Sequence, residues 1–201
     1  MITPTKRHLN ALKELINIGT GRSASVLNTM LQSHIVLQVP CVQIIPYNDL
    51  KYELKTLGGK WLAAVNMAFE GKFTGSTQLI FPTESASKLV AALIGEAPLP
   101  MDVDEVREGT LCEVGNIVLN GVMGSIANML KLNFQYSVPS FMADSVDKLF
   151  AQNDGKSETV VLFARTNFKV EKLCIDGFVV IFFEVASLDA LLNAIDNLIK
   201  P

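Results

Sequence analysis

Two pairs of polar residues share one spacing in otherwise apolar stretches of the sequence. Glu14 precedes Asn17 by three residues in ELIN, and Glu113 precedes Asn116 by three residues in EVGN. Residues three or four apart lie on the same face of a helix. Each pair therefore offers a carboxylate beside a carboxamide, and the carboxamide can both donate and accept hydrogen bonds. Glu14 and Asn17 are called the first pair below, and Glu113 and Asn116 the second pair.

The helix around the first pair is predicted to hold it outward. At about 100° per residue, Asn10, Glu14 and Asn17 fall within roughly 60° of one another. Leu12 and Ile16 point to nearly the opposite side and are expected to anchor this helix to the core. One such pair is common on a solvated helix face and indicates little by itself. Asparagine is a mediocre residue inside a helix, so its recurrence points to a use beyond helix formation.

The helix around the second pair follows the same design. Leu111 and Val118 are expected to anchor it, and Gly115 would permit close approach to the layer beneath. Ile18 lies beside the first pair and Ile117 beside the second. An apolar residue next to an exposed polar pair could belong to a docking surface, although a duplicated domain could also retain such a pair for structural reasons.

The two pairs belong to an internal repeat. A shift of 99 residues aligns identical residues over the first helices and the strand that follows, without a gap. The first-half members of these identities are Leu12, Glu14, Asn17, Ile18, Met30, Leu31, Val39 and Pro40. A shift of 102 aligns Gly75, Phe81, Ser85, Leu89 and Ala92 with identical residues of the second half. Met30 and its repeat mate Met129 are expected to be buried packing residues.

Each half is predicted to contain two helical segments, three strands and a final helix. In the first half, Thr3 and Pro4 begin a helix that runs to about Ile18, and Gly19 and Gly21 could kink it. The remaining elements are a helical segment to about 32, strands at 35–45, 61–71 and 75–82, and a helix at 83–95 capped by Thr83 or Ser85.

The second half repeats this plan. Its predicted elements are a helix from Asp102 and Glu105 to about 120, a helical piece to 130, strands near 133–142, 157–168 and 173–185, and a helix from Ser187. Residues 98–102 would be the hinge and 150–158 an exposed loop. We therefore expect an α/β (α+β) fold, in which residues 1–201 form a single domain with repeats at about 5–97 and 102–200. The two αα-βββ-α repeats would share one mainly antiparallel sheet with helices packed on it.

Composition excludes several classes of function. Hydrophobic residues make up 49% of the 201 residues, and the net charge is −3 with a pI near 5.4. That charge argues against a nucleic-acid partner and an anionic membrane surface. No apolar run approaches the roughly 20 residues of a membrane-spanning helix, and no secretory signal is visible. The three scattered cysteines suggest neither a zinc site nor a disulfide framework, so a cytoplasmic location is expected.

The spacing of the pairs resembles a family motif. Twenty-two residues separate Asn17 from Pro40, and twenty-two separate Asn116 from Pro139. This twofold pattern resembles the CheC/CheX/FliY phosphatases of bacterial chemotaxis, and the two-half organisation looks like the CheC arrangement over nearly the whole chain. The motif of that family begins with Asp or Ser. Asn10 stands at this position in the first half and Gly109, which offers no side chain, in the second.

The resemblance implies dephosphorylation of a CheY-like response regulator that carries a phosphoryl group on an aspartate. Such hydrolysis needs a water molecule held in line with the phosphorus. The resemblance assigns this role to Asn17 and Asn116, because a neutral carboxamide is not repelled by the anionic phosphoryl group. Glu14 and Glu113 would pair with a lysine of the partner. The chain is expected to need no cofactor of its own, since the Mg²⁺ would belong to the partner's receiver domain.

A different class of function stays open. The chain could be a non-enzymatic adaptor, or a flagellar-switch type of module, that binds phosphorylated receivers without hydrolysing them. The altered residues Asn10 and Gly109 favour this alternative. A homodimer formed through the sheet edges is a further alternative.

Overall fold

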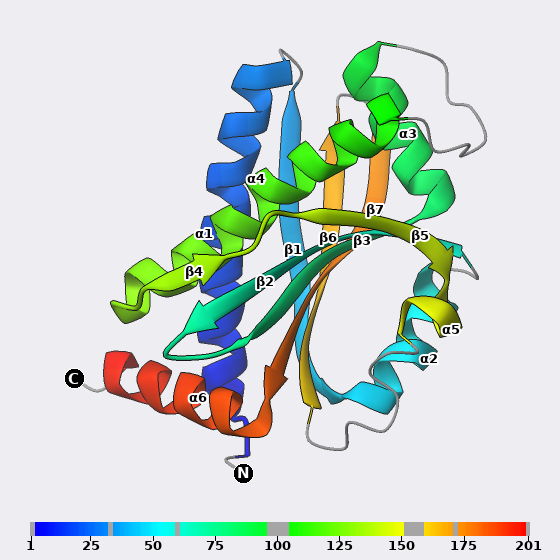
Figure 1. The fold of residues 1–201 in the computed structure, drawn as a ribbon. Helices are drawn as coiled ribbons and strands as arrows, with labels where there is room; N and C mark the ends of the chain where they lie inside the picture. The colour runs from blue at the N-terminus through cyan, green and yellow to red at the C-terminus, as the bar shows by residue number, and fades with distance from the viewer. Residues whose placement is uncertain are drawn as a thin grey trace.

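A seven-stranded sheet runs through the molecule and carries helices on both faces (Figure 1). The computed structural model describes residues 3–31, 34–58, 61–95, 105–150, 159–170 and 173–199. Its elements are α1 (Lys6–Leu31), β1 (Ile35–Pro46), α2 (Tyr47–Gly58), β2 (Trp61–Gly71), β3 (Gly75–Pro82), α3 (Thr83–Ile94), α4 (Glu105–Leu130), β4 (Phe134–Tyr136), β5 (Ser140–Ser145), α5 (Val146–Leu149), β6 (Thr159–Val170), β7 (Leu173–Glu184) and α6 (Val185–Ile199).

The sheet interleaves strands from the two halves of the chain. Its order is β1-β6-β7-β3-β2-β4, and β5 also pairs with β2. Every one of these pairings is antiparallel. The edge strand β1 of the first half pairs with β6 of the second, while β4 and β5 of the second half pair with β2 of the first. Each strand thus has its counterpart from the other half at the same distance from the opposite edge of the sheet. A pseudo-twofold axis between β7 and β3 relates the two halves.

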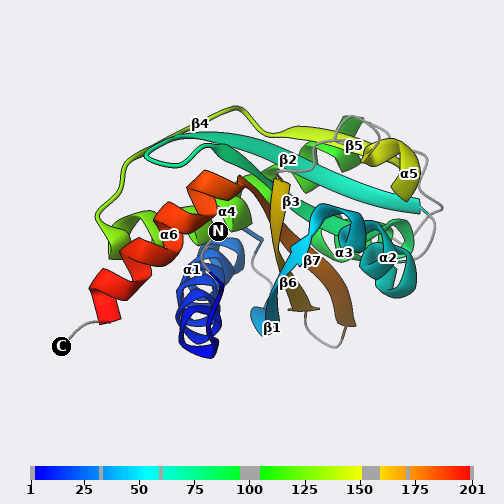
Figure 2. The ribbon, with the colours of Figure 1, turned by 90° about the horizontal axis from the view of Figure 1, so that it is seen from below.

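Two apolar cores lie on opposite faces of this sheet. The larger core joins one face of the strands to α1, α3, α4 and α6. The smaller core joins the other face to α2 and α5, through residues such as Leu50, Leu54 and Phe150. Neighbouring residues of a strand point to opposite faces, so in β2 Leu62 belongs to the smaller core and Ala63 to the larger. Figure 2 shows α2 near α5, apart from α1 and α6.

The expected fold class is confirmed, but the helices are distributed differently from the prediction. Each half reads helix, strand, helix, two strands, helix, because α2 and α5 follow the first strand of each half. The prediction placed two helical segments before that strand, where the structure has one continuous helix, and it did not include α2 and α5. The strand of the second half is also split into β4 and β5. The hinge at 98–102 and all but the first residue of the loop at 150–158 lie outside the described residues.

The two long helices α1 and α4 are continuous where the sequence suggested a kink. Gly19 of α1 lies against Gly121 of α4, and a Cβ built on Gly19 would lie 2.5 Å from the Gly121 carbonyl oxygen. Ser23 Oγ donates across the same contact to the Ile117 carbonyl oxygen at 3.0 Å. The glycines therefore allow two backbones to approach closely, and the helical hydrogen bonds continue through them.

The first turn of α1 is fixed by a reciprocal cap. The His8 backbone N–H donates to Thr5 Oγ1 at 3.3 Å, and the Thr5 backbone N–H donates to His8 Nδ1 at 3.2 Å. His8 is 2% exposed, and its Nε2 lies 2.8 Å from Asp196 Oδ1 of α6. The helix therefore begins after Thr5 rather than at Thr3 and Pro4 as predicted, and the histidine joins the start of α1 to the last helix.

Other local expectations are wrong for physical reasons. The N-cap of α3 is Pro82, and neither Thr83 nor Ser85 caps the helix through its side chain. Met30 and Met129 are 52% and 42% exposed rather than buried, because they lie towards the C-terminal ends of α1 and α4, beyond the closest contact of the two helices.

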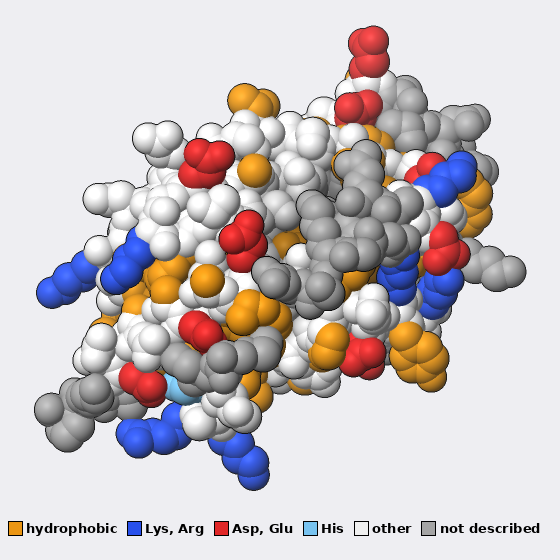
Figure 3. All heavy atoms as spheres, turned by 60° about the horizontal axis from the view of Figure 1, so that its bottom comes forward, with side chains coloured by type: hydrophobic (Ala, Val, Ile, Leu, Met, Phe, Trp, Pro, Cys, Tyr) orange, Lys and Arg blue, Asp and Glu red, His pale blue; other side chains and the backbone are white. Residues whose placement is uncertain are grey.

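The charges on the surface and the apolar helix α4 bear on whether a nucleic acid or a membrane is a partner. On the face shown in Figure 3, acidic and basic side chains are interspersed with apolar ones. By length and composition α4 could cross a membrane, but 56% of its most apolar window is buried inside the fold. That burial is typical of a helix in the core of a globular domain.

Candidate functional site

The first pair lies on the outer face of α1. Leu12 and Ile16 are fully buried in the larger core, and this burial fixes the rotation of the helix. Glu14 is therefore exposed and Asn17 is half-buried. Asn10, one turn before Glu14, is exposed as well. The structure thus brings these three side chains to one face, as the helical spacing predicts.

The second pair has the same setting on α4. Val118 is fully buried, and a Cβ built on Gly115 would lie 2.5 Å from the Val65 side chain of β2. This absence of a side chain brings the helix onto the sheet and turns Glu113 outward, where it is exposed. Asn116 is half-buried like Asn17. Among the described residues, neither glutamate of the two pairs has a hydrogen bond or an ion pair, so both carboxylates are available to a partner.

The amide of Asn17 is held by the backbone of the edge strand β1. Its Oδ1 accepts a hydrogen bond from the Val39 backbone N–H at 3.0 Å, and its Nδ2 donates to the Val39 carbonyl oxygen at 3.3 Å. These two bonds fix the plane of the amide. One N–H and one lone pair remain for another group, since a carboxamide has two donors and two acceptor sites.

Pro40 explains why a strand residue is available to Asn17. The register between β1 and β6 shifts between Gln38 and Cys41, where β1 contains one extra residue. A bulge of this kind leaves backbone groups outside the ladder, and proline has no N–H to offer a neighbouring strand. The Val39 peptide groups therefore point to α1. The 22-residue spacing between Asn17 and Pro40 therefore places the bulge beside the asparagine.

The second half departs from this arrangement. Val138 occupies the repeat position of Val39, but it is 87% exposed whereas Val39 is 2% exposed. Here the strand is interrupted between β4 and β5. Asn116 Oδ1 instead accepts from Asn120 Nδ2 one turn later, at 2.6 Å. The amide of Asn116 is thus held by a side chain of its own helix, and its own N–H donors have no partner among the described residues.

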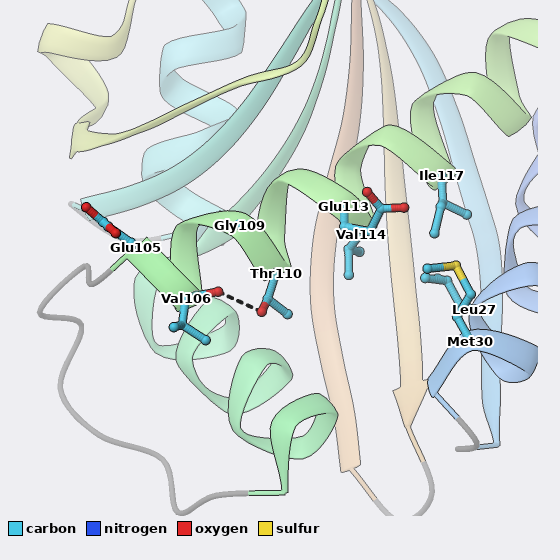
Figure 4. A pocket seen from close by; sticks show the side chains of 9 residues that line it. All are labelled: Leu27, Met30, Glu105, Val106, Gly109, Thr110, Glu113, Val114 and Ile117. Carbon is cyan, nitrogen blue, oxygen red and sulfur yellow. Dashed lines mark hydrogen bonds between the residues drawn. The ribbon is translucent and has the colours of Figure 1, made fainter.

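A groove adjoins the second pair (Figure 4). It has a volume of about 360 Å³ and lies between the C-terminal part of α1 and the N-terminal part of α4. Figure 4 shows Glu113 and Ile117 of α4 facing Leu27 and Met30 of α1. The outer end of the groove is formed by the first two turns of α4, from Glu105 to Thr110. The missing side chain at Gly109 helps to open this groove, because nothing lies within 4 Å of a Cβ built there.

The two pairs form separate sites. Gly19 meets Gly121 and Ser23 meets Ile117, so α1 and α4 run antiparallel and cross between the pairs. With a rise of 1.5 Å per residue, the two glutamates are about 20 Å apart along the helix pair. Cys112, beside Glu113, has a raised pKa because it is partly buried and because Glu108 adds negative charge. Its thiol is thus not activated for nucleophilic attack.

Comparison with known proteins identifies the family. The family described as chemotaxis phosphatase CheX matches residues 63–163, half of the chain. The chain belongs to the CheX family. The matched stretch contains Glu113, Asn116 and Pro139 of the second half, and the first pair lies outside it.

Individual relatives extend the likeness to most of the chain. The protein is 28% identical over 144 residues to "CheY-P phosphatase CheC" of Bacillus subtilis, which covers 69% of this chain and 68% of the relative. The structure of FliY from Thermotoga maritima has a TM-score of 0.79 at 15% identity, covering 98% of this chain and 99% of that one. A CheX–CheY–BeF3–Mg²⁺ complex from Borrelia burgdorferi has a TM-score of 0.51 at 22% identity, covering 86% and 99%. The two solved structures establish the fold.

Sequence reasoning found the two pairs but missed what surrounds them. The repeated proline indicates only a fixed spacing to the asparagine, and nothing in the sequence shows that the Val39 backbone binds the Asn17 amide. The groove beside the second pair has one signal in the sequence, Gly109 in place of a side chain, which by itself favours the non-enzymatic alternative and does not indicate a groove. The four site residues Glu14, Asn17, Glu113 and Asn116 stay predictions as to their roles.

Proposed function

We propose that the protein dephosphorylates the aspartyl phosphate of a CheY-like response regulator, using the two pairs as separate sites. Asn17 and Asn116 would orient the attacking water molecule, and Glu14 and Glu113 would dock a lysine of the partner. The observation that carries this proposal is the outward placement of two carboxylates that have no partner among the described residues, each one turn from an amide whose hydrogen-bonding groups are only partly used there. Membership in the CheX family and the likeness to CheC support it.

The chemistry proposed for the amide follows from its charge and geometry. A receiver's phosphoryl group is anionic, so a carboxylate placed against it would be repelled, whereas a carboxamide is neutral. An amide fixed by two hydrogen bonds loses little further freedom when it binds water, and such positioning contributes several kcal/mol to lowering a barrier. The clamp of Asn17 by Val39 provides this fixation in the first half. Any Mg²⁺ in the reaction would belong to the receiver, and we propose a cytoplasmic location for the encounter.

The test measures loss of phosphate from a labelled CheY-type receiver. Adding the protein should accelerate the loss, and the double variant Asn17→Ala/Asn116→Ala should abolish the acceleration. Because Asn17→Ala also removes two bonds to the strand, circular dichroism must show that the variant is folded at the assay temperature. Glu14→Gln/Glu113→Gln is the companion variant: it alters only exposed side chains and should raise KM more than it lowers kcat. A folded double asparagine variant with parental activity would disprove the mechanism.

The alternative is a binding module without catalysis, and one observation favours it. Two of the four hydrogen-bonding positions of the Asn17 amide are occupied by Val39, and one acceptor position of Asn116 by Asn120. Binding of the phosphorylated receiver with an unchanged rate of phosphate loss would support this module. Light scattering of the isolated protein tests the further expectation of a homodimer.

A further inference from the structure

The two sites differ in the charges that surround them. Residues 99 positions apart occupy equivalent places on α1 and α4, so each flanking residue of the first pair has a counterpart beside the second. The cations Lys6, Arg7 and Lys13 of α1 correspond to Glu105, Val106 and Cys112 of α4. Both sites contain the glutamate of the pair, which is Glu14 in the first and Glu113 in the second. At these three positions the first site thus has three cations, whereas the second has one carboxylate and no cation.

These flanking residues share the faces of the pairs. At about 100° per residue, Lys6, Lys13 and Asn17 lie within roughly 40° of one another, and Arg7 lies beside Glu14. Lys6 and Arg7 are exposed and Lys13 is half-buried. Glu105 and Val106 are exposed on α4 in the same way. A partner whose interface extends about 15 Å along the helix from an asparagine therefore also meets the flanking residues of that pair.

The groove beside the second pair adds a difference in polarity between the two sites. Beside the second pair, the exposed apolar side chains Met30 and Val106 line the groove together with Glu105 and Glu113. An apolar surface bordered by carboxylates fits a partner surface that carries apolar side chains together with lysine or arginine. At the repeat position of Val106 the first site has the cation Arg7, which fits an acidic partner surface instead.

We propose that the two sites select different phosphorylated receivers. The second pair would act on a receiver whose surface beside the phosphoaspartate is apolar and basic, and the first pair on a receiver whose corresponding surface is acidic. The proposal rests on the function proposed above and names the partner of each site. Exposed charges mainly change association rates and are screened beyond about 8 Å at physiological ionic strength, so the selection should be strongest at low salt.

The test separates the sites and changes only the receiver's charge. Asn116→Ala leaves the first site, and Asn17→Ala leaves the second, with Glu14→Ala as a second way to silence the first site without touching the strand. The substrate is one CheY-type receiver in two forms, with two lysines or two glutamates added beside its phosphorylation site. At low ionic strength the second site should turn over the lysine form with a kcat/KM about tenfold higher, and the first site should prefer the glutamate form to a similar degree. Both preferences should shrink as salt is added.

A charge exchange then assigns the preference to the named residues. In the Asn116→Ala background, Lys6→Glu/Arg7→Val gives the first site two of the three flanking residues of the second, with Lys13 unchanged, and should reverse its preference. Lys55→Ala/Lys148→Glu removes the same net charge from α2 and α5, on the other face of the sheet, and should leave the preference unchanged. Equal preferences at both sites, or a reversal by the control, would overturn this inference while the phosphatase activity stands. Failure of every variant and of the parent on both receiver forms would instead overturn the proposed function.

Discussion

The contrast between the two asparagines leads to a quantitative prediction about stability. Replacing Asn17 by alanine removes two hydrogen bonds to the Val39 backbone. Each such bond contributes about 1 kcal/mol net. Alanine recovers about 0.5 kcal/mol through its better helix propensity. The expected loss in the free energy of unfolding is therefore about 1.5 kcal/mol.

The matched variant is Asn116→Ala. It removes a contact between Asn116 and Asn120 of one helix, and pairs at this spacing contribute only about 0.2–0.5 kcal/mol. The gain in helix propensity offsets that loss, so the stability of this variant should stay within about 0.5 kcal/mol of the parent. The two substitutions are identical in type and lie at equivalent repeat positions. The difference between their effects on the free energy of unfolding therefore measures the contact of Asn17 with the strand.

Thermal and urea denaturation, followed by circular dichroism, measure the difference. For a chain of this size about 1 kcal/mol corresponds to 2–4 °C in Tm, so Asn17→Ala should melt about 3–6 °C below the parent and Asn116→Ala close to it. Asn17→Asp should be no more stable than Asn17→Ala, since it places a carboxylate oxygen against the Val39 carbonyl. Equal melting temperatures for the two alanine variants would refute the reasoning that the clamp distinguishes the sites.

Two further predictions concern glycine and cysteine. Gly19→Ala should destabilise the protein by about 1–3 kcal/mol, because its Cβ would meet the backbone of Gly121. Gly21→Ala places its Cβ in open space and should stabilise the protein by up to about 1 kcal/mol. Equal denaturation curves for the two variants would contradict the close helix contact at Gly19. In limited alkylation at pH 8 read by mass spectrometry, Cys112, partly buried and with a raised pKa, should react after the exposed Cys41. Modification of Cys112 first would show that its helix face is more open than the structure indicates.

The sequence by itself determined the repeat, the three strands of the first half, the last two strands of the second half and the outward direction of both pairs. It could do so because these features depend on local periodicity: a buried Leu12 and Ile16 fix where Glu14 and Asn17 point, whatever the helix packs against. The strands at 61–71 and 75–82 agree with β2 and β3 for the same reason, since strand alternation and turn residues are local signals.

Only the tertiary structure decided how the halves combine and how the sites differ. The effect of Gly19 depends on Gly121, a hundred residues away, because a glycine permits a kink and a close helix contact equally well. The clamp on Asn17 depends on a bulge in a strand that pairs with the other half of the chain. Two nearly identical motifs thus acquire different surroundings, because hydrogen bonds and grooves are formed by whichever residues the fold brings together.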